Sequence, residues 1–457
     1  MRPRRQTELF CEWLENYLDY ERIRKKEDFS LETIRFLVQR FKNPQASFRS
    51  IHVAGSKGKG SVSVMLSSIL EASGRQSGLY TSPHLLDFTE RVTRSGQPFS
   101  EEIYGRACDR VVPLVDSIIP GSIPGHGEPS WFELVTLFSF VVFQEAKLPW
   151  AVIETGLGGR LDATNVILPE ASVITPIELE HTEYLGNTIE AIAGEKAGII
   201  KPGVPVFTAP QDAKALSVLR AKAQSMQAPL IELTEVIDSL HAEPVDTGLK
   251  VEISFKHNRG AFNPEFSRPL SFTLSLPSII QAENAALAAC AAKAIIPDLE
   301  ESVIEEGLSR AWLPGRFEIV GNNPPLVLDG AHTVKSLALT MKTFRSRYSG
   351  PANLVFACAA DKNVDEMARL FDADFAHITV TRPGDKKQSD FDRVLAAFER
   401  ERGHKADSRL EGMPDYQNAI TTAVQRSRDE GRPLLITGSF YLVAEAKKLL
   451  ASLNPDR

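Results

Sequence analysis

Short apolar runs alternate along this chain with longer segments in which apolar residues recur at helical spacing. In the first half of the chain these runs occupy residues 49–53, 151–154, 171–175 and 204–207. Each run is nearly uninterrupted and too short for a helix, which is typical of strands buried on both faces of a parallel sheet. Residues 61–72 have a helical pattern that Gly74 is expected to end. The alternation of strand and helix predicts an α/β fold.

The pattern changes after residue 240 and then resumes. Residues 250–256 and 270–276 alternate between apolar and polar, which predicts a small antiparallel sheet, and residues 282–295 return to a helical pattern. Four further strands are expected at residues 326–329, 354–357, 378–381 and 434–437. Because 457 residues are too many for one ordinary core, we expect two domains, 1–312 and 313–457, with the boundary near Leu313.

Composition and charge exclude several classes of protein. Lys and Arg number 52 against 59 Asp and Glu, and this net charge of −7 argues against nucleic acid as a partner. The most apolar helical segment, 131–146, contains Glu133, Gln144 and Glu145 and is too short to span a bilayer, so we interpret it as a buried core helix. Four scattered cysteines fit a reducing compartment, and the basic N-terminus has no apolar core. We therefore expect a cytoplasmic protein with no membrane partner.

The strongest local motif is IHVAGSKGKGS at residues 51–61. An expected strand runs into a turn with glycines at 55, 58 and 60, where backbone N–H groups can surround a phosphate without an obstructing Cβ. Lys59 would lie on the β- and γ-phosphates, and Ser61 could reach Mg²⁺. Gly60 separates Lys59 from Ser61, so the spacing is not that of a standard Walker motif. The motif predicts nucleotide binding, and the alternative is a solvated Gly/Lys turn.

A carboxylate follows another of the expected strands. Glu154 ends the run WAVIE, at the strand end where doubly wound sheets place their ligands. The next residues, TGLGGRLDATN, combine three glycines with polar side chains, which is not a core composition. Glu154 is therefore the candidate partner of a metal ion beside the phosphate loop.

Taken together, these motifs resemble the folylpolyglutamate synthase/dihydrofolate synthase branch of the Mur ligase superfamily. The matching segments are HVAGSKGKGS at 52–61, YTSPHL at 80–85, ERVTRSGQ at 90–97, ETGLGGRLDATN at 154–165, EHTEYLGNTIEAIAGEKAGIIKPG at 180–203, LPGRFE at 313–318, LDGAH at 328–332 and TGSFYLVAE at 437–445. The resemblance implies an N-terminal P-loop ATPase domain of the Mur ligase type and a C-terminal Rossmann-like α/β domain that carries the glutamate ligase region.

The resemblance also implies roles for individual residues. The implied ATP-binding residues are Gly55, Ser56, Lys57, Gly58, Lys59, Gly60, Ser61, Asn284, Arg316 and Asp329. The implied Mg²⁺ ligands are Ser82, Glu154 and His181, and the implied catalytic residues are Lys59, Lys196 and His332. Lys196 matches a lysine that many family members carry as a carbamate, and the alternative is a plain salt-bridging lysine. The pterin side is expected against Ser130, Trp131 and Phe132 and near Asp162, although Trp131 and Phe132 could equally be core aromatics.

The chain departs from the family pattern at four positions. Thr333 and Val334 follow the DGAH motif where Asn and Pro are usual, Glu180 precedes His181 where Asp is more usual, and Lys57 stands where Asn is common. The two changes after His332 affect the expected nucleotide contacts of that loop and leave the reaction class unchanged.

The resemblance predicts an ATP-dependent ligase. Its substrates would be ATP, L-glutamate and a folate or dihydropteroate, joined through an acyl phosphate with Mg²⁺ present, by a monomeric enzyme. Two alternatives stay open: another Mur-type amide ligase, and a nucleotide-binding protein without ligase activity.

Overall fold

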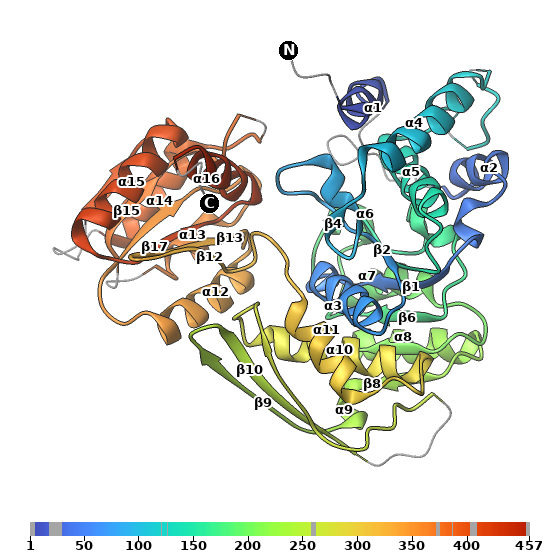
Figure 1. Cartoon of the computed structure of the whole chain (residues 1–457). Helices are drawn as coiled ribbons and strands as arrows, with labels where there is room; N and C mark the ends of the chain where they lie inside the picture. The colour runs from blue at the N-terminus through green and yellow to red at the C-terminus, as the bar shows by residue number, and fades with distance from the viewer. Residues whose placement is uncertain are drawn as a thin grey trace. The chain divides into compact units, whose positions relative to one another are not determined.

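The structure is a computed structural model that describes residues 5–17, 30–119, 121–125, 127–256, 262–371, 375–385, 387–402 and 409–453. The chain divides into two compact units (Figure 1). The first comprises Met1–Ala242, Lys250–Ser275 and Gln281–Trp312, and the second comprises Glu243–Leu249, Leu276–Ile280 and Leu313–Arg457. The chain passes from the first unit into the second for the last time at Leu313. Two short segments that precede Leu313 also belong to the second unit.

An eight-stranded sheet forms the centre of the first unit, in the order β4-β3-β2-β5-β1-β6-β7-β8. Its parallel strands are β1 (Arg49–Ala54), β2 (Ser77–Tyr80), β5 (Trp150–Glu154), β6 (Ala171–Ile174), β7 (Val206–Thr208) and β8 (Leu230–Glu232). The antiparallel edge is β3 (Val92–Arg94) and β4 (Gln97–Pro98). The predicted strands are confirmed, although β7 begins two residues later than expected. Because β1 lies between β5 and β6, the loops that follow these three strands emerge at one edge.

Eleven α-helices of the described residues accompany this sheet and the small one beside it. They are α1 (Gln6–Leu14), α2 (Glu32–Arg40), α3 (Lys59–Ala72), α4 (Glu101–Asp116), α5 (Trp131–Glu145), α6 (Thr182–Leu185), α7 (Ile189–Lys196), α8 (Ala213–Ser225), α9 (Leu233–Val236), α10 (Ile280–Ile295) and α11 (Glu301–Arg310). Helix α5 is buried from Glu133 to Phe143, which confirms the predicted core helix. Within the described residues, no helix combines the length and apolar character needed to cross a membrane.

Three further strands form a separate small sheet in the order β11-β10-β9, with β9 at Ile237–Val245, β10 at Gly248–Phe255 and β11 at Leu270–Leu274. The strands expected at 250–256 and 270–276 correspond to β10 and β11. Strand β9 was not expected, because IDSLHAEPV has few apolar residues and contains a proline.

The second unit is built on a six-stranded sheet in the order β12-β13-β17-β14-β15-β16. Its strands are β12 (Glu318–Asn322), β13 (Pro325–Asp329), β14 (Ala352–Phe356), β15 (Phe375–Val380), β16 (Arg409–Gly412) and β17 (Leu434–Thr437). All pairings are parallel except that of β12 with β13. Helices α12 (Val334–Arg347), α13 (Val364–Ala368), α14 (Phe391–Arg402), α15 (Tyr416–Glu430) and α16 (Phe440–Leu453) cover it (Figure 1).

Side chains of α12 hold the two early segments of the second unit. Arg347 donates from Nη1 to the carbonyls of Val245 (2.6 Å) and Gly248 (3.0 Å) and from Nη2 to that of Asp246 (2.9 Å). Thr343 Oγ1 lies 3.4 Å from Ser278 Oγ. A guanidinium that binds three carbonyls fixes the turn between β9 and β10 within the second unit.

Candidate active site

The predicted phosphate loop connects the central strand β1 to helix α3. Gly55 has φ 149° and Gly58 has φ 90°, backbone conformations that side chains with a Cβ rarely adopt. A Cβ on Gly55 would lie 1.8 Å from Thr175 Oγ1, so only glycine fits against the end of β6. The loop therefore closes tightly over the sheet edge and delivers backbone N–H groups at the start of α3, which is the arrangement that binds phosphate.

Polar contacts fix the shape of this loop. Lys59 Nζ donates to the carbonyl of Gly55 (3.0 Å), so the side chain folds back over the loop. Ser56 donates from its backbone to Pro176 O (2.9 Å), and its hydroxyl accepts from Glu178 N (3.0 Å). Ser61 is buried at the first turn of α3. Lys59 and Ser61 both lie in the first turn of α3, directly after this loop, and their roles towards the nucleotide stay predictions.

Asn284 reaches the same loop from a distant part of the sequence. A Cβ on Gly58 would lie 2.7 Å from Asn284 Oδ1, which places this amide directly against the loop. Asn284 is buried near the start of α10 and donates to Gln281 Oε1 (2.9 Å). Asn284 therefore lies against the loop, and its contact with the nucleotide stays a prediction.

Lys196 is buried beneath the phosphate loop at the end of α7, with 1% of its side chain exposed. Its ammonium donates to Gly55 O (2.7 Å) and to Glu180 Oε1 (2.9 Å). Burial lowers the pKa of Lys196 to about 8, against the opposing effect of Glu180, and Lys59 adds to the lowering. Burial alone would raise the pKa of Glu180, but Lys196, Lys59 and Lys57 lower it to about 2. The Glu180 carboxylate is therefore ionised and is surrounded by the positive charges of three lysines.

Two of the three predicted metal ligands lie together. Glu154 ends β5 beside Val53 of β1, is buried, and accepts from the backbone N–H of Ser82 (3.2 Å). His181 is the exposed residue before α6 and has φ 46°. Across the described ranges, no group of three or more His, Cys, Asp and Glu side chains is arranged to hold a metal ion. The hydroxyl and carboxylate of Ser82 and Glu154 are still oxygen donors of the kind Mg²⁺ prefers, so the residues fit that ion.

Two of the four residues predicted for the pterin side, Ser130 and Asp162, have polar side chains that accept hydrogen bonds from the local backbone. Ser130 and Glu133 form a capping box at the start of α5, with Ser130 Oγ accepting from Glu133 N (3.2 Å). Asp162 accepts from Thr164 N (3.0 Å) at one oxygen and from Leu157 N (2.9 Å) at the other. Burial raises the pKa of Asp162, and these hydrogen bonds oppose the rise. Both side chains therefore stabilise local structure.

Of the two predicted aromatics, Phe132 borders the glycine-rich loop after β5 and Trp131 packs against Arg91. The ring of Phe132 covers Gly156, where a Cβ would lie 2.4 Å from Phe132 Cζ. The guanidinium of Arg91 lies 4.8 Å from the centre of the Trp131 ring, and Arg91 Nε donates to His84 Nδ1 (2.8 Å). Both aromatics are partly buried, so each packs on the core while leaving part of its surface exposed.

The remaining predicted residues gather at the carboxyl edge of the second sheet. Asp329 ends β13 and accepts from Phe317 N (2.8 Å), Ala331 N (2.9 Å) and Thr340 Oγ1 (2.8 Å). The guanidinium of Arg316 lies 4.1 Å from the centre of the Phe440 ring, and the His332 ring lies 5.7 Å from the same ring. Phe440 thus brings Arg316 and His332 together.

Thr333, one of the departures from the family pattern, caps helix α12. Its hydroxyl accepts from Ser336 N (3.3 Å). Asn and Thr are both good capping residues, and the first helical position accepts Val as well as Pro. The substitutions at 333 and 334 therefore preserve the helix start behind His332.

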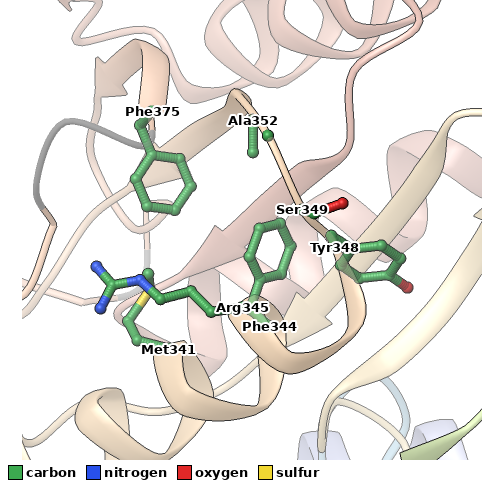
Figure 2. Close-up of a pocket in the computed structure, with 8 residues that line it drawn as sticks. Met341, Phe344, Arg345, Tyr348, Ser349, Ala352 and Phe375 are labelled. Atoms are coloured by element: carbon green, nitrogen blue, oxygen red, sulfur yellow. The ribbon is translucent and has the colours of Figure 1, made fainter.

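A pocket of about 180 Å³ in the second unit contains none of the predicted residues (Figure 2). Its lining residues are Met341, Phe344, Arg345, Tyr348, Ser349, Gly350, Ala352 and Phe375. Ala352 and Phe375 begin strands β14 and β15, whereas Asp329 ends β13. Ligands of doubly wound sheets bind at the carboxyl ends of strands, so this pocket lies at the opposite edge from the candidate site residues of this unit.

Several contacts at the site were not anticipated from the sequence. The sequence gives no local signal that Glu180 pairs with lysines or that Phe440 and Arg91 contact predicted site residues. His52, a polar residue in the middle of a buried strand, was the clearest unused signal, because such positions are normally apolar.

In the first unit, the parallel sheet carries at its carboxyl edge a glycine-rich phosphate loop, a buried carboxylate and a lysine cluster. The second unit is a Rossmann-like α/β unit. Together these features define a nucleotide-dependent enzyme with the architecture of the Mur ligases.

Comparison with known proteins agrees with this class. Residues 315–440 match the glutamate ligase domain of the Mur ligases. The chain is 32% identical over 426 residues to the dihydrofolate synthase/folylpolyglutamate synthase of Bacillus subtilis, covering 92% of this chain and 94% of the relative. It is 30% identical to the folylpolyglutamate synthase of Lacticaseibacillus casei, covering 89% and 91%. A crystal structure of Mycobacterium tuberculosis folylpolyglutamate synthase with ADP and AMPPCP aligns at a TM-score of 0.85 and 28% identity over 97% and 98% of the chains.

The chain belongs to the folylpolyglutamate synthase/dihydrofolate synthase family of ATP-dependent ligases. The fold class and the reaction class predicted from the sequence are both confirmed.

Proposed function

We propose that this enzyme joins L-glutamate to a folate, to dihydropteroate, or to both, with cleavage of ATP to ADP and phosphate. The observation that carries the proposal is the phosphate loop at Gly55–Ser61, held over the buried Lys196–Glu180 pair and next to Glu154. The names and high coverage of the relatives from Bacillus subtilis and Lacticaseibacillus casei support the choice of substrates.

The reaction requires two anions to meet. An oxygen of the acceptor carboxylate attacks the γ-phosphorus of ATP, the bond to the bridging oxygen breaks, and ADP leaves behind an acyl phosphate. The amine of glutamate then attacks the acyl carbon, loses a proton and expels phosphate. Lys59 and the loop N–H groups reduce the repulsion in the first step, because they concentrate positive charge where the phosphoryl group transfers.

We propose Mg²⁺ binding by Ser82, Glu154 and His181. When bound, this ion neutralises phosphate charge and orients the phosphate oxygens. The contribution of this chain is a buried carboxylate at Glu154, oriented by the backbone N–H of Ser82. His181 is the exposed residue directly before α6, with a backbone φ of 46°.

We propose that Lys196 exchanges between an ammonium and a carbamate. Only the neutral amine reacts with CO₂; the nitrogen bonds to the carbon and loses a proton. Burial supports this exchange, because a pKa near 8 makes the neutral amine accessible at neutral pH. The carbamate would face the Glu180 carboxylate and the ATP phosphates, so it needs additional positive charge from a cation or from Lys57 and Lys59.

The other assignments are proposals of the same kind. We assign ATP binding to residues 1–312 and glutamate ligation to residues 313–457, with His332 catalytic and Arg316, Asp329 and Asn284 as nucleotide contacts. The acceptor would contact Trp131 and Phe132, in a monomeric cytoplasmic enzyme.

One assay tests the function and separates its two forms. ADP release is measured with dihydropteroate or with tetrahydrofolate, each with and without L-glutamate. Release that needs both an acceptor and glutamate supports the proposal, and the preferred acceptor identifies the dominant activity. ATP turnover that depends on neither acceptor nor glutamate would contradict the proposal. No turnover with either acceptor would favour one of the two alternatives, another Mur-type ligase with a different acceptor or a non-catalytic nucleotide-binding protein.

A further inference from the structure

His52 occupies an unusual position for a histidine. It lies in β1, the strand between β5 and β6, and none of its surface is exposed. Parallel strands buried on both faces are normally apolar. Burial, together with the nearby charge of Lys201, lowers the pKa of His52 to about 3, so the ring is neutral under all ordinary conditions.

A chain of hydrogen bonds runs from this ring to the loop after β5. His52 Nε2 lies 2.9 Å from Thr164 Oγ1, and Thr164 Oγ1 donates to Asp162 Oδ1 (2.5 Å). The other oxygen of Asp162 accepts from Leu157 N (2.9 Å). Leu157 follows Gly156, whose Cα lies under the Phe132 ring. This series of hydrogen bonds therefore links β1, which leads into the phosphate loop, with the residues that are proposed to contact the acceptor.

The direction of each hydrogen bond follows from the number of protons available. Threonine has one hydroxyl proton, which Asp162 accepts, so Thr164 Oγ1 must in turn accept from His52 Nε2–H. His52 Nδ1 then carries no proton, and it is buried without a hydrogen-bond partner among the described residues. The reverse direction would leave a buried Nδ1–H group unpaired, which folded proteins rarely tolerate.

We infer that His52 is a positioning residue for the acceptor side of the reaction, acting as an Nε2–H donor through Thr164 on Asp162 and the 155–165 loop. This inference rests on the proposed function, because the acceptor side is defined by it. His52 does not touch the substrates. We expect His52 to orient the loop that carries Gly156 and Asp162. We do not expect it to change the contacts of Lys59 with phosphate.

Matched variants separate positioning from simple packing. In His52→Gln the amide nitrogen lies as many bonds from the backbone as Nε2, so the donor to Thr164 is kept. In His52→Asn the amide lies one bond nearer, at the level of Nδ1, and the donor is lost. Thr164→Val removes the link, whereas Thr164→Ser keeps it. Ser67→Ala, which removes a buried hydrogen bond to Ser77 (3.2 Å), is the control for loss of a buried contact elsewhere.

The experiment measures KM for the acceptor and for ATP, kcat and Tm. We expect His52→Asn and Thr164→Val to raise the acceptor KM by roughly tenfold, in line with the loss of one buried hydrogen bond, with the ATP KM unchanged. His52→Gln, Thr164→Ser and Ser67→Ala should keep the acceptor KM of the wild type. If His52→Gln and His52→Asn behave alike, or if changes in KM follow Tm for every variant including Ser67→Ala, His52 is only a core residue and the inference is wrong.

A second measurement is independent of catalysis. Nitrogen NMR of labelled histidine in the full chain, assigned with His52→Gln, should show His52 as a neutral Nε2–H tautomer that does not titrate between about pH 5 and 9. The opposite tautomer would overturn the hydrogen-bond chain itself. A wild-type enzyme that shows this tautomer but no turnover with either acceptor would overturn the proposed function, and with it the role of His52, while leaving the chain of contacts intact.

Discussion

Gly156 offers a direct test of where the acceptor binds. Gly156→Ala would place a Cβ 2.4 Å from Phe132 Cζ, whereas carbon atoms in contact are separated by about 3.5–4.0 Å. Because Gly156 does not adopt a positive φ, alanine fits its backbone and the steric conflict is the only strain. The Phe132 ring must therefore move by about 1 Å or more, and overpacking of this kind costs about 1–3 kcal/mol.

Because Phe132 is partly buried and packs on the core, we expect the ring to move towards its exposed side, where we place the acceptor. Binding of the acceptor would then have to reverse the movement, so the acceptor KM should rise roughly 5- to 150-fold, the equivalent of that energy, while the ATP KM stays constant. The assay is ADP release at varied acceptor and saturating ATP and glutamate. Gly105→Ala is the control, because the nearest atom to a Cβ there is Gln6 Cγ at an ordinary 3.5 Å. An acceptor KM equal to that of the wild type would refute the placement of the acceptor against Phe132.

Three further predictions concern the phosphate side. Lys59→Ala should lower kcat by at least ~10²-fold with an unchanged circular dichroism spectrum, because one preorganised charge on the transferring phosphoryl is lost; near-normal turnover would contradict this. Glu154→Gln and His181→Ala should each need more Mg²⁺ for half-maximal ADP release, and titration curves that overlay the wild type would place the metal elsewhere. Lys196→Ala should lose activity that small carboxylic acids in the buffer partly restore. Full activity of this variant without added acid would leave Lys196 as a structural residue.

The sequence predicted those parts of the fold that depend on local pattern. The apolar runs of β1, β5 and β6 identify buried parallel strands because both of their faces are covered. Strands such as β16, with the sequence RLEG, have no such run, since an edge strand with an exposed face needs few apolar residues. The phosphate loop was predictable because its glycines are required by the backbone itself.

Contacts made across long stretches of sequence could not be predicted in the same way. Lys196 meets Gly55 across 141 positions, and nothing near either residue indicates that Glu180 lies between three lysines. The capping box of Ser130 and Glu133 was a different case. The spacing of serine and glutamate is a known helix-start signal, and it accounts for the contact of Ser130 without pterin binding. A residue within a functional motif can thus have a structural contact that local rules already explain.

The path of the chain through the second unit limits how this protein can be divided. Residues 243–249 and 276–280 belong to that unit, and Arg347 and Thr343 bind them, yet both segments precede Leu313. A separately expressed 313–457 fragment would lack these partners and leave the Arg347 guanidinium without its three carbonyls. We therefore expect that the region 315–440, which matches the glutamate ligase domain, cannot be transplanted alone. Gene fusions or split reporters inserted at residue 313 would cut through a folding unit, and successful exchange of the second unit between relatives requires the β9–β10 turn to be exchanged with it.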